Sequence, residues 1–248
     1  MTCPRENEPR LSAPGRAAIL LVAALLLTAT TGALPVAPSP VENQVREIRE
    51  RPTLAHTVSG IRVKSGLPLY EFLLANPDIT AALARALGAA TYQVSPDGEN
   101  GFRGQDSKGA QGHFMLVEQG EGRRVFFARG TYKKPLLPTI AGRLVLVLEY
   151  RTDGAGEAGV ENRVQGFVRI DTAIVGTLAK IARPLVKRSL DKKVHYLFQK
   201  IDRLLDAALA NPSEAIRRLQ ENGTNPSQDL ETLRRLLEAE VASKTPAP

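Results

Sequence analysis

The chain has 248 residues, a formal net charge of +7, 43% hydrophobic residues, 5% aromatic residues, one cysteine and no tryptophan. Its 20 glycines and 17 prolines are unremarkable for this length. These totals exclude a collagen-like, a disulfide-rich and a wholly disordered protein. A single folded domain with extensions fits them best.

Residues 1–33 have the layout of a secretory signal peptide. Three arginines and two glutamates lie in residues 1–16, and an uncharged Ala/Leu-rich run follows over 17–32. We expect cleavage after Ala33, which makes the protein exported, periplasmic or extracellular. The alternative is an uncleaved N-terminal membrane anchor, although the run is short for a span of about 20 residues. Cleavage removes Cys3, the only cysteine, and lowers the formal net charge to +6.

Residues 34–53 are predicted to form a Pro-rich tether and a short helix. Residues 34–40 (LPVAPSP) contain three prolines, which favour an extended linker. In residues 41–51, Val45 and Ile48 stand among Glu and Arg. We therefore expect an exposed helix that contributes little to a core.

From residue 54, strand and helix signals follow one another. A first strand is expected over 54–64, where β-branched and polar residues alternate. Two short helices are expected over 68–74 and 77–87, with Asn76 as the N-cap of the second. Six further strands are expected, over 91–95, 101–106, 112–119, 123–132, 143–151 and 160–171. Their connections are too short for crossover helices, which predicts an antiparallel meander.

Helical periodicity returns after residue 171. Apolar residues recur three to five positions apart, which predicts a helix over 173–182 and a longer one over 184–209, separated at Pro184. We interpret residues 54–210 as one domain. Beyond it we expect a helical appendix, with helices over 213–220 and 228–242, and a disordered tail over 245–248.

This order of elements resembles the START-like superfamily, which includes lipid-transfer domains and polyketide cyclases. The likeness covers about residues 54–209 and rests on the topology and on the stretch 166–171 (GFVRID) that leads into the helix. It implies an α+β helix-grip fold, with a curved antiparallel sheet of about seven strands around a long C-terminal helix. It also implies a cavity for an apolar ligand between sheet and helix. The superfamily has no short catalytic signature, and we expect no cofactor.

Several predicted strands carry apolar residues on both faces, as Val145 and Leu146 illustrate, so something apolar should cover each face. Plain helix packing and a ligand cavity explain this pattern equally well. We expect the cavity to be lined by Tyr92, Arg103, Phe114, Phe127, Leu146, Leu148, Glu149, Asn162, Val164, Leu197 and Ile201. Cross-strand ion pairs, such as Glu149 with Arg163 or Arg169, are the alternative explanation of the charged members.

Positive charge is concentrated in one predicted helix. The window 180–203 has eight basic and two acidic residues, a net charge of +6 that equals the net charge of the whole mature chain. A basic stripe beside an apolar helix face suits an anionic membrane surface. The expected contacts are Leu136 and Leu137 in the loop 133–140, with Lys180, Arg183, Lys187, Arg188, Lys192 and Lys193. The alternative is a solvated outer helix face.

No motif points to a specific reaction. His56, His113 and His195 are far apart and lack metal-ligand spacing, so we expect no metal site. Export and the lack of an aromatic stacking pattern argue against nucleic acid as a partner. We predict an exported binding or carrier protein for a lipid or another apolar small molecule, and favour a non-enzymatic role. Two alternatives stay open: a cyclase or hydrolase-type enzyme using the same cavity, and a non-catalytic envelope interaction protein.

Overall fold

The computed structural model describes residues 39–244, apart from 99, 108, 134–138, 154–158, 173–174 and 224–226. Of residues 175–190 and 193 it describes the backbone alone. The predicted signal peptide, most of the predicted tether, the loop residues Leu136 and Leu137, and the tail 245–248 lie outside the described residues.

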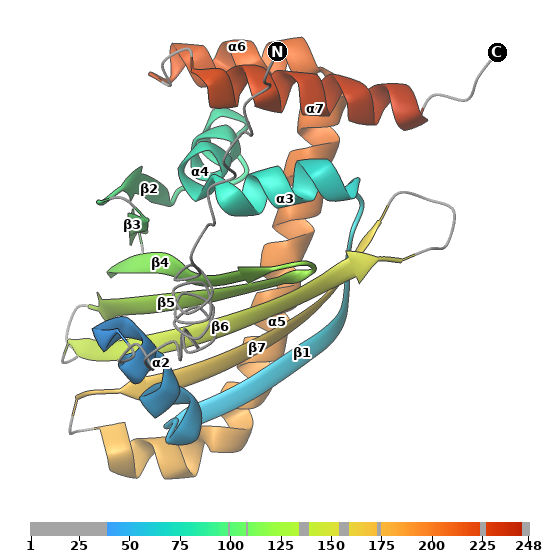
Figure 1. Cartoon of the computed structure of the whole chain (residues 1–248). Helices are drawn as coiled ribbons and strands as arrows, with labels where there is room; N and C mark the ends of the chain where they lie inside the picture. The colour runs from blue at the N-terminus through green and yellow to red at the C-terminus, as the bar shows by residue number, and fades with distance from the viewer. Residues whose placement is uncertain are drawn as a thin grey trace, which may run out of the picture. The chain divides into compact units, whose positions relative to one another are not determined.

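Seven antiparallel strands form one open sheet in the order β1-β7-β6-β5-β4-β3-β2 (Figure 1). The strands are β1 (Leu54–Val63), β2 (Gln93–Pro96), β3 (Gly101–Gln105), β4 (Ala110–Gly120), β5 (Arg123–Tyr132), β6 (Ile140–Thr152) and β7 (Val160–Ile170). The predicted meander is confirmed, because each strand from β2 to β6 pairs with the next strand along the chain. The first strand, β1, pairs with the last, β7.

The described helices are α2 (Pro40–Glu50), α3 (Leu67–Ala75), α4 (Pro77–Ala86), α5 (Val175–Ala210), α6 (Pro212–Glu221) and α7 (Gln228–Lys244). Together with the sheet they give the predicted α+β helix-grip arrangement, in which the long helix α5 contacts β1. The two helices expected on either side of Pro184 are a single helix of 36 residues. A proline removes one backbone hydrogen bond, and the helix continues through it.

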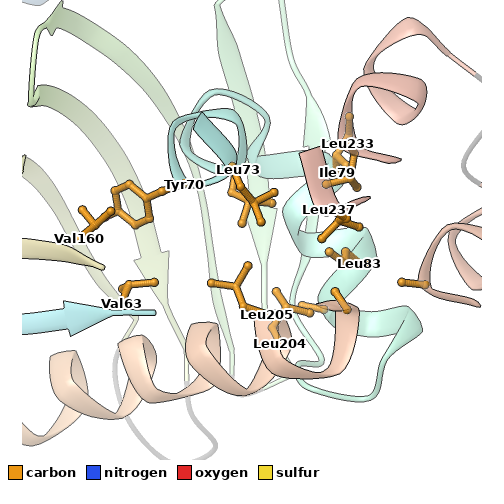
Figure 2. Close-up of a cluster of buried hydrophobic side chains, with 14 of the residues drawn as sticks. Val63, Tyr70, Leu73, Ile79, Leu83, Val160, Leu204, Leu205, Leu233 and Leu237 are labelled. Atoms are coloured by element: carbon orange, nitrogen blue, oxygen red, sulfur yellow. The ribbon is translucent and has the colours of Figure 1, made fainter. Parts of the chain in front are cut away.

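The larger core lies between one face of the sheet and helices α3 to α7. Figure 2 shows Tyr70 of α3, Leu83 of α4, Leu205 of α5 and Leu237 of α7 in one cluster. The last two helices are part of this core, since Leu219, Leu233 and Leu237 are fully buried. Helices α6 and α7 are therefore integrated into the main core and do not form a separate appendix.

The opposite face of the sheet is covered by α2 (Figure 1). Its Ile48 is fully buried and packs with Val125, Phe127, Val145 and Val147 of β5 and β6. The expectation that this helix contributes little to a core was wrong. Three apolar residues, Val41, Val45 and Ile48, recur at spacings of four and three, so they lie on one side of the helix and cover the sheet.

The first turn of α2 is fixed by a capping box. The Ser39 hydroxyl accepts a hydrogen bond from the Glu42 N–H at 3.2 Å, and the Ser39 N–H donates to the Glu42 carboxylate at 2.6 Å. This reciprocal pair satisfies two backbone donors that a helix start leaves without partners. The cap sets where the helix begins, directly after the proline-rich segment.

Candidate functional site

A row of four glycines crosses the sheet on the face that carries the larger core. Gly104 of β3 lies opposite Gly112 of β4, and the row continues through Gly130 of β5 to Gly142 of β6. A Cβ atom on Gly112 would lie 2.5 Å from the carbonyl oxygen of Arg129, and one on Gly130 would lie 2.6 Å from that of Gln111. Neighbouring backbones thus approach too closely for side chains, as they do at sheet bends.

Beside this row the sheet face is hollowed. The hollow has a volume of about 580 Å³, within the range of roughly 300–1,000 Å³ that is typical of small-molecule sites. The side chains around it on this face are apolar or aromatic: Tyr92, Val94, Phe114, Ala128, Tyr132, Ile140, Leu144, Val168 and Ile170. Phe114 also stacks on Phe102, with ring centroids 5.4 Å apart. The glycines form a floor without side chains, and the apolar residues form the walls.

The hollow and the larger core divide the same face of the sheet between them. Along β6, Ile140 and Leu144 line the hollow, whereas Leu148 and Tyr150 are buried in the core. Phe114 and Leu144 are only half-buried, so the hollow opens to solvent. No helix residue whose side chain the structure describes lines it. Among the described side chains, helices cover one half of the face, and the other half presents apolar side chains of the strands.

Few ionisable side chains face the hollow. Partial burial raises the pKa of Tyr92 above its ordinary value, while nearby Arg85 acts in the opposite direction. At the rim, the Asp106 carboxylate accepts a hydrogen bond from the Ala110 N–H at 2.9 Å. His113, Arg129 and Arg143 border the hollow, but by strand alternation their side chains belong to the opposite face. The described lining thus lacks a converging pair of acid and base groups.

Of the eleven predicted cavity residues, two line the hollow and the others lie elsewhere. Tyr92 and Phe114 line the hollow. Leu148, Asn162 and Val164 are buried in the larger core, and Leu146 and Ile201 pack against it. Asn162 is held there by three hydrogen bonds: its Oδ1 accepts from the Tyr70 hydroxyl, and its Nδ2 donates to the Val160 carbonyl at 2.9 Å and to the Ile61 carbonyl at 3.4 Å. Leu197 belongs to α5 but is 53% exposed, so it faces solvent.

Three predicted cavity residues, Arg103, Phe127 and Glu149, lie on the opposite face of the sheet. Phe127 is buried beneath α2. Glu149 forms ion pairs with Arg123 at 3.2 Å and Arg163 at 3.8 Å, and Arg103 lies 3.7 Å from Asp97. These residues correct the expected cavity lining. Both faces of these strands are apolar, so alternation alone did not tell which face meets the long helix.

The described part of α5 exposes basic and apolar side chains together. Tyr196 and Leu197 are 51% and 53% exposed, and the Lys200 Nζ lies 5.1 Å from the Tyr196 ring centroid. Lys192, Tyr196 and Arg203 are exposed and share one side of the helix. We call Lys192, Tyr196, Leu197, Lys200 and Arg203 the basic stripe. The side chains of Lys180, Arg183, Lys187, Arg188 and Lys193 lie outside the described residues.

Two of the three acidic residues in the described part of α5, Asp191 and Asp202, face the sheet. His56 Nε2 donates to Asp191 Oδ1 at 2.7 Å, and the Lys64 N–H donates to Asp202 Oδ1 at 3.0 Å. Both partners belong to β1 or directly follow it. These two carboxylates are engaged by or next to β1, whereas Asp206, three residues after Arg203, is exposed.

Sequence reasoning missed a buried ionisable cluster that joins α3 to the sheet. Arg124 donates from Nη1 to the Gly120 carbonyl at 2.7 Å, and its Nη2 lies 3.6 Å from Glu71 Oε1. The Tyr150 hydroxyl donates to the same Glu71 oxygen at 2.7 Å, and burial raises the pKa of Tyr150 to about 12. These groups engage one another in the larger core, away from the hollow. The contacts of Arg124 and Tyr150 with Glu71 join α3 to the sheet within the core.

The described residues contain no group of three or more His, Cys, Asp or Glu side chains arranged to hold a metal ion. Of the helices that the structure describes, none combines the length and apolarity needed to span a membrane.

Comparisons with known proteins give weak structural likenesses. No family model matches the chain, and no curated protein matches it either. A conserved protein of Geobacillus kaustophilus is 11% identical with a TM-score of 0.38, covering 59% of this chain and 96% of its own. The di-domain ARO/CYC protein BexL, from a biosynthetic pathway, is 14% identical with a TM-score of 0.38, covering 77% of this chain and 61% of its own. A hypothetical protein of Helicobacter pylori is 11% identical with a TM-score of 0.37, covering 71% of this chain and 96% of its own. None of these likenesses says what this chain binds.

Proposed function

We propose that this protein is an exported member of the START-like superfamily that binds a lipid or another apolar small molecule in the hollow. The hollow itself carries the proposal. It has about 580 Å³ of space, a floor of glycine backbone and walls of apolar and aromatic side chains. Apolar surface left open on one half of an otherwise packed sheet face favours an apolar occupant.

We favour a carrier over a cyclase or hydrolase. General acid–base catalysis needs titratable groups within hydrogen-bond reach of the reacting atoms. The described lining of the hollow supplies the Tyr92 and Tyr132 hydroxyls and, at the rim, the Asp106 carboxylate, which accepts from the Ala110 N–H; it supplies no converging acid–base pair. An interaction protein whose cavity is filled by its own side chains fits less well, because the hollow is open among the described residues.

We also propose that the carrier acts at an anionic membrane surface. The basic stripe pairs exposed aromatic and apolar side chains with lysine and arginine, the combination that interfacial helices use. Its acidic neighbours, Asp191 and Asp202, are turned towards β1 and do not offset this charge at the surface. The loop residues Leu136 and Leu137 remain part of this proposal.

The test of ligand binding is mass spectrometry of what the purified full chain retains. The protein is extracted with organic solvent after purification without detergent, and a protein of similar size purified in parallel is the control. We expect the extract to contain a lipid or other apolar compound in an amount that is a substantial molar fraction of the protein. Protein that is free of ligand and gives no fluorescence increase with a neutral apolar probe would overturn it.

A further inference from the structure

Basic side chains from five neighbouring strands form a row on the face of the sheet opposite the hollow. Arg103 of β3 lies opposite His113 of β4, and the row continues through Arg129, Arg143 and Arg169 of β5, β6 and β7. Adjacent strands are about 4.8 Å apart, and like charges directly opposite one another destabilise a sheet. Such a row therefore needs negative partners.

Acidic side chains supply those partners at the two ends of the row. Asp97 pairs with Arg103 and His113 at one end. At the other end, Asp171 accepts two hydrogen bonds from Arg143, at 2.8 and 3.1 Å, and these raise the pKa of Arg143. Glu47 of α2 lies 3.3 Å from Arg143 and 3.4 Å from Arg169. Four of the five basic residues are thus engaged.

Arg129, in the middle of the row, is the exception. It is exposed, and no described residue forms a hydrogen bond or ion pair with it. It lines a groove of about 760 Å³ together with Arg103, His113 and Arg143. Gln44 of α2, Gln111 and Thr131 add neutral donors to the walls, and Asp171 is the one carboxylate among the described lining residues. The groove is therefore electropositive at its centre.

We infer that this groove binds an oxyanion group, a phosphate or a carboxylate, with Arg129 as its central partner. A guanidinium offers two parallel N–H donors that match the oxygens of either group. An anion between His113 and Arg143 would also offset the repulsion within the row. The group can belong to a soluble anion or to an acidic lipid headgroup, since the chemistry of recognition is the same.

The test is a titration of the full chain with inorganic phosphate in low-salt, chloride-free buffer, followed by backbone amide NMR. We expect saturable shifts at Gln111, Thr131 and Arg129. Arg129→Ala should weaken phosphate binding about tenfold or more, the factor of a lost charge-assisted hydrogen bond. The phosphate affinity of Arg129→Lys should lie between those of the parent chain and Arg129→Ala, because lysine keeps the positive charge but lacks the two parallel N–H donors of the guanidinium.

The matched control is Arg151→Ala, which removes the same charge from β6. Arg151 is 77% exposed and pairs with Glu161 at 2.6 Å, outside the groove. This variant should bind phosphate like the parent chain. Equal weakening in the two alanine variants would show a general charge effect and overturn the inference, as would the absence of saturable shifts in the groove.

Vesicles distinguish the two sources of the anion. Sedimentation with phosphatidylcholine vesicles containing phosphatidylglycerol is compared for the parent chain and Arg129→Ala. Loss of both phosphate and vesicle binding in Arg129→Ala assigns the groove to a lipid headgroup. Loss of phosphate binding with unchanged vesicle binding assigns it to a soluble anion. Both results also require that Arg151→Ala behaves as the parent does.

Discussion

The Glu240 carboxylate of α7 accepts a hydrogen bond from the Gly66 N–H at 2.9 Å, across 174 residues of chain. The carboxylate is almost fully buried, and the Lys244 Nζ lies 3.0 Å from it. Gly66 is the N-cap of α3, so the last helix holds the start of the first core helix. A Cβ atom on Gly66 would lie 2.5 Å from Glu240 Oε2, so any other residue here would displace the carboxylate from its present position.

Glu240→Ala should lower the free energy of unfolding by about 1–3 kcal/mol, because it leaves the partly buried Gly66 N–H without the Glu240 carboxylate as its partner. Urea unfolding of the full chain followed by circular dichroism measures this. Glu238→Ala is the control, since Glu238 lies on the same helix but is exposed, with Arg234 at 3.5 Å. Equal, small effects of the two substitutions would show that the contact between α7 and α3 contributes little.

Ile48→Ala should destabilise the protein by about 2–4 kcal/mol, the usual range for emptying a buried aliphatic site. Ile48 is fully buried against β5 and β6, so its loss leaves a cavity under α2. Thermal and urea unfolding measure the effect, with the exposed neighbour Glu50→Ala as control. An Ile48→Ala chain as stable as the parent would mean that α2 is not part of the cooperative fold.

Alkaline pH should destabilise the protein through its buried tyrosines. Burial, and then the hydrogen bond to Glu71, raise the pKa of Tyr150 from 10 to about 12, and burial also raises the pKa of Tyr70. The folded chain keeps these phenols protonated where the unfolded chain ionises them. The contribution of Tyr150 is therefore complete below about pH 10 and is lost as the pH rises towards 12, whereas that of Tyr70 persists to higher pH.

Urea unfolding at several pH values between about 8 and 12 measures this loss. Tyr150→Phe should show a shallower decline in unfolding free energy than the parent chain. Tyr196→Phe is the control, because Tyr196 is half-exposed, and it should follow the parent. Parallel declines in the parent and in Tyr150→Phe would contradict the prediction.

Replacing the exposed apolar residues of the basic stripe should weaken vesicle binding. The double substitution Tyr196→Ser and Leu197→Ser removes the side chains that would enter the lipid interface and keeps every charge. Sedimentation with vesicles containing phosphatidylglycerol measures the change, and we expect a loss of at least about tenfold in partitioning. Binding that stays unchanged, or that persists in high salt, would contradict membrane contact through this helix.

The sequence predicted the strands well because their limits depend on local chemistry. Turn residues such as Pro96-Asp97-Gly98 and Gly120-Glu121-Gly122 mark where strands end, and the alternation between them marks the strands. The limits of β5 were predicted without error. The many Glu and Arg residues of α2 predict an exposed helix, whereas the spacing of Val41, Val45 and Ile48 places these three apolar side chains on one side of it, against the sheet.

The site depends on pairing, which composition does not reveal. Gly104, Gly112, Gly130 and Gly142 are up to 38 residues apart in the chain and form a row only through the register of four strands. The basic row has the same origin. Both rows follow from the strand register, because the register decides which side chains share a face of the sheet. A shift of one residue in the pairing would place each side chain on the other face. Likewise, Arg103, Phe127 and Glu149 were assigned to the hollow because that register was unknown.

The central claim, that the hollow binds an apolar ligand, is tested most directly by filling it. A Cβ atom on Gly104 would lie 3.5 Å from Phe114 Cε1 and 3.9 Å from the Gln93 carbonyl oxygen, both ordinary van der Waals contacts, so Gly104→Leu adds a side chain at the floor without a backbone clash. Gly120→Leu is the matched control, since its Cβ atom meets nothing within 4 Å. The measurement is the affinity of the full chain for a neutral apolar fluorescent probe. We expect the affinity for the probe to be lower by about tenfold or more in Gly104→Leu and to equal that of the parent chain in Gly120→Leu. Equal affinity in all three proteins would contradict it.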